Sequence, residues 1–259
     1  MKNVQGRVRW TRECAIRGDA EESDQKCPAW MMESTVIGPL RSINASHGRY
    51  NSIVTLVVTE VFQSLQGEGP AIGSPATFIR LSGCNLNCSY CDTNHENGEN
   101  MALTELVDKV NSGPGRVIIT GGEPLLAGEK LVPLAQAIST TGRSVDIETN
   151  GTISPPAGLA EQIDNYVISP KLSNSGNALD ARGLADDLPP GPLKFAVDKE
   201  DALDEIKEIV EALPGREVFI MPLGTDPREM ISTMILLRPA VEARGWRLLP
   251  RLHVLLGFR

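Results

Sequence analysis

The fold of this 259-residue chain is constrained most by a regular alternation of short apolar runs and helical stretches, which begins at residue 53. Residues 53–58 are rich in β-branched side chains and predict the first strand. Alternation of this kind implies an α/β fold, in which helices cover a parallel sheet. Further strands are predicted at 76–81, 116–120, 144–148, 166–168, 193–197 and 217–221, and helices at 103–110, 130–140, 199–213 and 226–244; the apolar run 252–256 closes the series.

Polar residues and glycines gather where the predicted strands end. The strand at 116–120 is followed by a pair of glycines, the strand at 144–148 by Thr-Asn-Gly, and the strand at 166–168 by Ser-Pro-Lys. Folds of this class build their binding sites at the carboxyl ends of their strands. We therefore expect the functional site along this edge of the sheet.

The first 52 residues differ from the rest in charge and pattern. They hold eight of the 25 basic and six of the 33 acidic residues, so this segment is net +2 and the remainder is net −10. They show no sustained helical or strand period, so we expect a disordered extension at 1–52 and one folded domain at 53–259. Cys14 and Cys27 lie in the extension, thirteen residues apart and without a neighbouring pair of ligands, which is a poor pattern for a metal site.

Composition excludes several classes of protein. A formal charge of −8 argues against a surface that binds nucleic acid. No stretch approaches the roughly 20 apolar residues that span a bilayer. The first residues carry several arginines and lack the apolar core of a signal peptide.

Three cysteines, Cys84, Cys88 and Cys91, follow the second predicted strand with the spacing CxxxCxxC. Three thiolates on one loop can hold three irons of an iron–sulfur cluster and leave a fourth iron open to a ligand. A zinc site with His95 as fourth ligand is the alternative, because closed zinc sites have four ligands. Three unrelated buried thiols are a further alternative, which the polar neighbours disfavour. The spacing favours the cluster and leaves zinc open.

The triplet, with an aromatic residue before its third cysteine, resembles the signature of the radical S-adenosylmethionine (SAM) superfamily. Five further segments are similar to one family within it, the 7-carboxy-7-deazaguanine synthases. The resemblance covers about four fifths of the chain, from about Thr55 onward, and residues 1–52 have no counterpart. The segments are VFQSLQGEG at 61–69, CDT at 91–93, TGGEP at 120–124, ETNG at 148–151 and SPK at 169–171.

The resemblance implies a partial, open βα barrel with a 4Fe-4S cluster on Cys84, Cys88 and Cys91 and with SAM chelating the fourth iron. It implies that the Glu123 carboxylate lies near the methionine ammonium of SAM. Glu148 would bind the ribose hydroxyls, or else be a solvated carboxylate at a strand end. Lys171 would face the site, or else be a surface cation, and residues 221–224 match a further SAM contact only loosely. The implied SAM contacts are Tyr90, Cys91, Asp92, Gly122, Glu123, Glu148, Ser169, Pro170 and Lys171.

The resemblance also implies a pterin site. Gln66 can both donate and accept hydrogen bonds, Glu68 can accept from the amino and ring N–H groups, and Arg80 would pair with the substrate carboxylate. Thr93 resembles a hydroxyl ligand of Mg²⁺, which prefers oxygen ligands. The implied substrate contacts are Leu65, Gln66, Gly67, Glu68, Arg80 and Thr120, and the tail residues His253 and Arg259 lie where the family's C-terminus folds back.

The implied enzyme is a carbon–nitrogen lyase of queuosine biosynthesis, a tRNA-modification pathway. It would convert 6-carboxy-5,6,7,8-tetrahydropterin to 7-carboxy-7-deazaguanine with release of ammonia. We expect a cytoplasmic homodimer that is reduced by a flavodoxin or ferredoxin type of donor and binds neither nucleic acid nor membrane, since the cluster needs a reducing compartment. The alternatives are a glycyl-radical-enzyme activase of the same superfamily, which would share the triplet and GGEP but not SLQGEG, and a zinc-binding interaction module.

Overall fold

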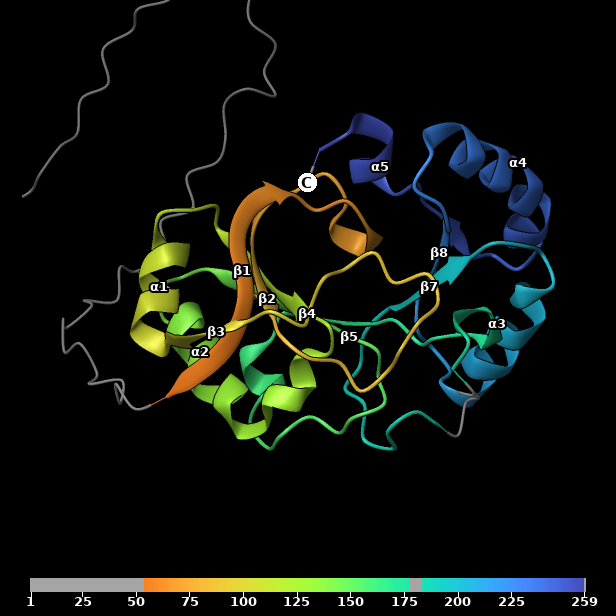
Figure 1. The fold of residues 1–259 in the computed structure, drawn as a ribbon. Coiled ribbons are helices and arrows are strands. Elements are labelled where there is room, and N and C mark those ends of the chain that lie inside the picture. The colour runs from red at the N-terminus through yellow and green to blue at the C-terminus, as the bar shows by residue number, and fades with distance from the viewer. Residues whose placement is uncertain (1–53, 178–182, 259) are drawn as a thin grey trace, which may run out of the picture. The chain divides into compact units, whose positions relative to one another are not determined.

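The computed structural model describes residues 54–177 and 183–258 (Figure 1). The expected extension at 1–52, with Cys14 and Cys27, lies outside the described residues, and so does Arg259. Within the described ranges, no helix is long and apolar enough to cross a membrane.

The strands of the described chain form one sheet in the order β3-β1-β2-β4-β5-β6-β7-β8-β9. From β2 to β9 every neighbouring pair is parallel, which confirms the predicted parallel sheet over that stretch. The bounds are β1 Thr55–Leu65, β2 Pro75–Leu81, β3 Glu99–Ala102, β4 Arg116–Gly121, β5 Ser144–Thr149, β6 Asn165–Ile168, β7 Leu193–Val197, β8 Val218–Pro222 and β9 Arg247–Leu248.

The sheet departs from the sequence prediction at its first edge. β1 continues to Leu65, and it pairs antiparallel with both β2 and β3. The connection from β1 to β2 is too short for a crossover, so these strands can only form a hairpin. This connection is closed by hydrogen bonds from the Gln66 N–H to the Ser74 carbonyl (2.8 Å) and from the Gly73 N–H to the Gln66 carbonyl (2.7 Å). The short strands β3 and β9 were not predicted.

The four longer predicted helices are all present. Pro133 lies in the first turn of α2, where a backbone N–H is not needed for the helix. Asp226 caps α4, because its carboxylate accepts hydrogen bonds from the N–H groups of Arg228 (2.8 Å) and Glu229 (3.1 Å). The apolar run 252–256 forms a short helix. The bounds are α1 Leu103–Asn111, α2 Leu131–Ser139, α3 Ala202–Ala212, α4 Pro227–Ala243 and α5 Leu252–Leu256, with 3₁₀ turns η2 Gly69–Ala71, η3 Pro124–Lys130, η4 Ala160–Gln162 and η5 Ser173–Ser175.

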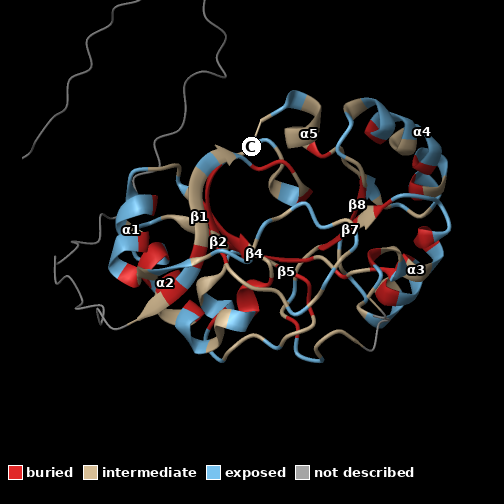
Figure 2. Ribbon diagram, in the orientation of Figure 1, coloured by how far each residue is buried: buried red, intermediate tan, exposed pale blue. Residues whose placement is uncertain are grey.

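The sheet curves into an open arc with its helices on the outer side: α1 and α2 lie near β1 and β2, and α3 and α4 lie near β7 and β8 (Figure 1). The main core packs between the sheet and the helices and includes the fully buried Ile119, Ile147 and Ile138 (Figure 2). Phe78 and Ile118 belong instead to a small separate cluster with Phe62. Because successive side chains of a strand alternate between faces, this cluster lies on the inner face of the arc. The fold is the expected partial, open βα barrel.

Candidate functional site

Two adjoining cavities open on the inner side of the sheet. The larger has a volume of about 610 Å³ and the smaller about 190 Å³. The larger is bounded by β1, β2 and the C-terminal segment, and the smaller by the cysteine loop and the ends of β5 to β8. Seven residues line both cavities and form their common wall: Glu68, Asp92, Thr93, Thr120, Gly121, Glu148 and Arg251.

The predicted substrate contacts line the larger cavity and most of the predicted SAM contacts line the smaller one, while Glu68, Asp92, Thr93, Thr120 and Glu148 line both. Glu123 and Pro170 line neither of them, and both are buried. The larger cavity is lined by all of the predicted substrate contacts, Leu65, Gln66, Gly67, Glu68, Arg80 and Thr120, together with His253. The smaller is lined by Cys84, Cys88, Cys91 and the predicted SAM contacts Tyr90, Asp92, Gly122, Glu148, Ser169 and Lys171, together with Met221 and Leu223.

The cysteine loop runs between β2 and β3 and carries three free thiols. The Cys84 Sγ accepts a hydrogen bond from the Leu86 N–H (3.4 Å), and the Cys88 Sγ accepts one from the Asn177 side-chain amide (3.2 Å). Burial raises the pKa of the Cys84 and Cys88 thiols above its ordinary value. A bound metal therefore has to supply the positive charge that converts these thiols to thiolates.

The cysteine loop is anchored through the backbone of His95. No group of three or more His, Cys, Asp or Glu side chains in the described parts of the chain is arranged to hold one ion. The His95 carbonyl anchors the loop instead, accepting hydrogen bonds from the Gly83 N–H (2.7 Å) and the Ser82 hydroxyl (2.6 Å). His95 also lines the smaller cavity together with the three cysteines.

The glycine pair after β4 lets the backbone pass close to the cysteine loop. A Cβ atom at Gly122 would lie 2.2 Å from the Gly83 carbonyl oxygen and 2.8 Å from the Cys84 Cβ. The next residue ties the two segments together, since the Glu123 N–H donates to the Gly83 carbonyl (2.9 Å). Only glycine allows this close approach, which leaves backbone groups facing the cavity beside the cysteines.

The Glu123 carboxylate is buried and lines neither cavity, and its place near the ammonium of SAM stays a prediction. It accepts hydrogen bonds from the Leu125 N–H (2.9 Å), the Thr149 hydroxyl (2.8 Å) and the Asn150 N–H (2.7 Å). The residue is 1% exposed. A buried carboxylate is stable only with such partners, and these bonds join the loop after β4 to the end of β5. Its role here is to hold the two strand ends together.

Lys171 is a cation of the site and not of the surface. Its ammonium donates hydrogen bonds to the Ser169 carbonyl (2.7 Å) and hydroxyl (2.9 Å), and the side chain lines the smaller cavity. Burial lowers its pKa, and the neighbouring Lys194 adds to that effect, whereas Cys88 and Glu123 oppose it. The smaller cavity therefore has a positive group beside its cysteines, which favours negatively charged sulfur there.

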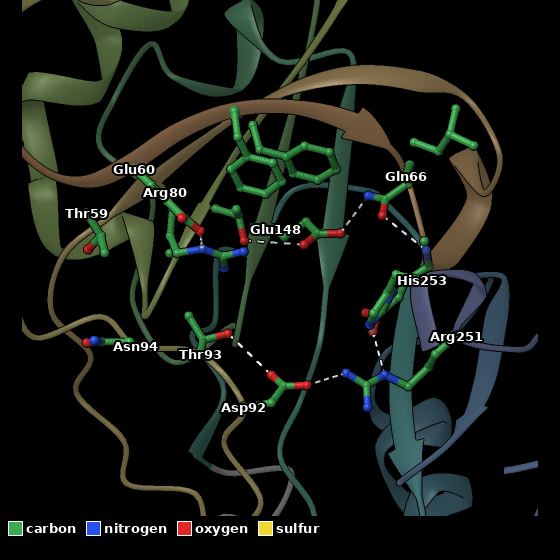
Figure 3. A pocket seen from close by; sticks show the side chains of 17 residues that line it. Thr59, Glu60, Gln66, Arg80, Asp92, Thr93, Asn94, Glu148, Arg251 and His253 are labelled. Carbon is green, nitrogen blue, oxygen red and sulfur yellow. Dashed lines mark hydrogen bonds and ion pairs between the residues drawn. The ribbon is translucent and has the colours of Figure 1, made fainter. Parts of the chain in front are cut away.

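The larger cavity has a buried network of charges at its base. The Lys194 ammonium lies 3.0 Å from Glu68 Oε2 and 3.0 Å from Glu148 Oε1, and the Arg251 Nε lies 2.9 Å from Glu68 Oε1. Arg251 also pairs with Asp92, which follows Cys91 (Figure 3). Burial alone would raise the pKa of Glu68, but Lys194 and Arg251 hold it well below its usual range. Glu68 therefore stays ionised and can accept hydrogen bonds from a ligand.

Glu148 joins this network, and its contact with the ribose of SAM stays a prediction. Its carboxylate accepts hydrogen bonds from the Gln66 side-chain amide (3.1 Å), the Thr120 hydroxyl (3.3 Å) and the Lys194 ammonium (3.0 Å). Two of these donors are predicted substrate contacts. Glu148 lies in the common wall, so it can reach ligands in both cavities (Figure 3).

Arg80 is fixed by its neighbours on β1. Its Nε donates to Glu60 Oε1 at 2.8 Å, and its guanidinium lies 5.7 Å from the centroid of the Phe62 ring. Phe62 in turn stacks on Phe78, with centroids 4.9 Å apart. The Nε of Arg80 is thus used in a hydrogen bond to Glu60, and the fork of terminal N–H groups of the guanidinium is available to a ligand. The side chain lines the larger cavity (Figure 3). Such a fork suits a carboxylate ligand.

The C-terminal segment closes the larger cavity. The Leu252 N–H donates to the Gly67 carbonyl (2.8 Å), and His253 lines the cavity. A Cβ atom at Gly67 would lie 2.2 Å from His253 Nδ1, so this contact requires glycine. Burial lowers the pKa of His253, and the nearby Arg251 adds to that effect, while Glu68 opposes it. The imidazole is therefore neutral at pH 7.

Sequence reasoning missed Lys194, Arg251, Glu60 and Asn177. Lys194 gave the one usable signal, because a lysine between Leu193 and Phe195 in a buried strand needs a charged partner. The other three are polar residues without a motif, and they join the site only through contacts between distant segments.

The open βα sheet, with three free cysteines and a glycine pair beside its strand ends, is the architecture of a radical SAM enzyme. Residues 78–174 match the Radical SAM superfamily. The 7-carboxy-7-deazaguanine synthase of Pyrobaculum aerophilum is 38% identical over 207 residues, which cover 76% of this chain and 93% of the relative. That of Hyperthermus butylicus is 37% identical over 232 residues, covering 83% of this chain and 97% of the relative.

The solved structures agree with this result. The crystal structure of QueE from Escherichia coli matches with a TM-score of 0.61 and 26% sequence identity, covering 77% of this chain and 95% of that chain. The chain belongs to the 7-carboxy-7-deazaguanine synthase family. It is a radical SAM lyase, and membership of the superfamily implies a 4Fe-4S cluster and SAM as cofactors. The activase and zinc-module alternatives are not supported.

Proposed function

We propose that this enzyme converts 6-carboxy-5,6,7,8-tetrahydropterin to 7-carboxy-7-deazaguanine with release of ammonia, as a step of queuosine biosynthesis. The observation that carries this proposal is the common wall between the cavities, in which Glu68, Glu148 and Thr120 border both spaces. A radical formed at the smaller cavity would meet a substrate in the larger one without crossing solvent. Such proximity is what a reaction through a short-lived radical needs.

In this proposal Cys84, Cys88 and Cys91 hold the cluster, and the glycine pair with Ser169 and Lys171 surrounds SAM. The donor set suits this assignment, since three sulfur atoms line one cavity, N–H groups point at two of them, and Lys171 lies nearby. When bound, these cofactors would supply the radical chemistry that exchanges a hydrogen with the substrate's C6 without net consumption of SAM. The protein supplies position and electrostatics.

The larger cavity would bind the pterin through its charged base. Glu68, kept ionised by Lys194 and Arg251, accepts hydrogen bonds from the amino and ring N–H groups. Gln66 and Glu148, already bonded to each other, offer further donors and acceptors along the same edge. The fork of Arg80 pairs with the substrate carboxylate at the opposite end of the cavity. The substrate would then lie along the common wall, to which Glu68 and Glu148 belong.

Thr93 would contribute a hydroxyl ligand to Mg²⁺. It lines both cavities, and its hydroxyl lies 3.3 Å from Asp92 Oδ1, so a hydroxyl and a carboxylate would both be available to the Mg²⁺. Mg²⁺ commonly keeps several water ligands, so one protein ligand is sufficient. We further propose a cytoplasmic homodimer with a flavodoxin or ferredoxin type of electron donor, because the cluster needs a reducing compartment.

A product assay tests the proposed function directly. The protein is reconstituted with iron and sulfide without oxygen and incubated with SAM, Mg²⁺, a reductant and 6-carboxytetrahydropterin. We expect 7-carboxy-7-deazaguanine and ammonia in equal amounts, with little net loss of SAM. Cys88→Ala is the control and should form no product. A wild-type protein that carries its cluster and cleaves SAM but forms no deazaguanine would overturn the proposed reaction.

A further inference from the structure

The segment after β6 binds the cysteine loop along its length. The Ser89 N–H donates to the Ser175 carbonyl (2.9 Å), and the Asn87 N–H donates to Asn177 Oδ1 (3.2 Å). Between these two bonds, Asn177 Nδ2 donates to the Cys88 Sγ (3.2 Å). Asn177 therefore contacts Cys88 although the two residues are 89 positions apart in the chain. Asn177 has no other role in the proposed reaction.

Every polar atom of the Asn177 carboxamide is hydrogen-bonded in this position. One amide hydrogen serves the Cys88 Sγ, the other serves the Ser175 hydroxyl (3.1 Å), and the oxygen accepts from the Asn87 N–H. A carboxamide has two donor hydrogens and one acceptor oxygen, so every polar function has a partner. Turning the group over would face the Asn87 N–H with another N–H. The network thus fixes an N–H donor on the sulfur.

Cys88 differs in this respect from the other two cysteines. Cys84 receives only a backbone N–H at 3.4 Å, and the group near the Cys91 Sγ is the Thr93 carbonyl oxygen at 3.6 Å, which cannot donate. The Cys88 sulfur therefore receives a side-chain N–H donor that the structure gives to neither of the other two cysteine sulfurs.

We propose that Asn177 is a positioning residue that raises the reduction potential of the cluster through its hydrogen bond to the Cys88 sulfur. The inference rests on the proposed function, which places the cluster on Cys84, Cys88 and Cys91. Reduction by one electron adds negative charge that is shared with the cysteine sulfurs, so an N–H dipole on Sγ stabilises the reduced form more than the oxidised form. Hydrogen bonds to the sulfurs are one of the factors that set such potentials.

Two variants of Asn177 and one matched control test the proposal. Asn177→Leu removes all hydrogen bonds of the side chain at similar volume, and Asn177→Asp keeps the shape and the acceptor while replacing the N–H with negative charge. Asn174→Leu is the control, because Asn174 lies in the same segment but its side-chain amide bonds to the Ala196 carbonyl (3.3 Å) and Asp198 (3.0 Å), not to a cysteine. The full-length reconstituted proteins are titrated potentiometrically without SAM or pterin, with electron paramagnetic resonance as readout.

We expect a more negative midpoint potential for Asn177→Leu, a still more negative one for Asn177→Asp, and the wild-type value for Asn174→Leu. Wild-type potentials in both Asn177 variants at full iron content would overturn the proposal. Loss of iron from both variants while they remain folded, as judged by circular dichroism, would also overturn it, because Asn177 would then only support the loop. The midpoint potential requires no turnover, so failure of the product assay would contradict the proposed function and leave this result intact.

Discussion

The Lys194 ammonium lies 3.0 Å from Glu148 Oε1, and this single buried cation also contacts Glu68 Oε2 at the same distance. Lys194 comes from β7, Glu148 from the end of β5, and Glu68 from the loop after β1. The side chain of Lys194 is 6% exposed, so its charge is balanced by these carboxylates and not by water. One residue without any motif thereby holds together the base of the proposed pterin site.

Removing this cation should destabilise the fold strongly. Lys194→Met would leave two buried carboxylates without their partner, and breaking a buried ion pair in this way costs about 3–5 kcal/mol. The matched control is Lys207→Met, because Lys207 is 62% exposed and its pair with Glu211 spans 3.9 Å. That exposed pair contributes about 0–1 kcal/mol. The measurement is urea denaturation at pH 7, and equal losses in the two variants would contradict this reading of the network.

The same network predicts how stability depends on pH. The folded-state pKa of Glu68 lies well below its ordinary value of 4.5, so its ion pairs contribute fully above about pH 4.5 and are lost as the pH falls toward the folded-state pKa. The stability difference between wild type and Glu68→Gln should therefore be constant from pH 7 to about pH 5 and shrink below that. Denaturation of the metal-free proteins between pH 3 and pH 7 measures it. A stability difference between the two proteins that grows as the pH falls would contradict the prediction.

Arg80 should matter for the substrate and not for SAM. Replacing it with alanine removes the charged fork that we assign to the carboxylate, and one charge-assisted interaction is worth about 1.5–3 kcal/mol, or roughly 10- to 150-fold in kcat/KM. Formation of 5′-deoxyadenosine without substrate should stay close to wild type. The control is Arg143→Ala, since Arg143 is bonded to Asn111 away from both cavities. Normal turnover by Arg80→Ala would contradict the assignment of Arg80 to the substrate carboxylate.

Gly67→Ala tests the contact between the substrate loop and the C-terminal segment. The added Cβ would overlap His253 Nδ1 at 2.2 Å, so His253 and the tail must move out of the larger cavity. We expect a large loss of kcat/KM for the pterin, with iron content unchanged. Gly115→Ala is the control, because nothing lies within 4 Å of its Cβ position. The two variants are compared by product assay and iron analysis, and equal activity would show that the contact is not needed.

The segment before the folded domain should be dispensable for catalysis. We predicted that residues 1–52 form a disordered extension, and the motifs that carry the proposed chemistry all lie between residues 61 and 171. Protein that begins at residue 51 should bind the same amount of iron and form product at the wild-type rate. The comparison is made at equal cluster content. A truncated protein that keeps its cluster but loses activity would show that the extension takes part in the reaction.

Local sequence patterns predicted much of this protein. The alternation of apolar runs predicted β2, the strands from β4 to β8 and the longer helices, because burial on a sheet or helix face leaves a period in the sequence itself. The cysteine triplet likewise depends on spacing along a single loop. The direction of β1 relative to β2 could not be predicted in this way, since a strand pattern does not say whether the next connection is a hairpin or a crossover.

The sequence by itself therefore determined the α/β class, the cysteine loop and the strand ends at which the site lies. Only the tertiary structure decided the partners of the charged groups. Glu123 bonds with Thr149, and Glu148 bonds with Lys194, and no motif in the sequence predicted either partner. The reason is physical: a buried charge takes the orientation that gives it partners, and those partners come from strands that become neighbours only when the sheet is assembled.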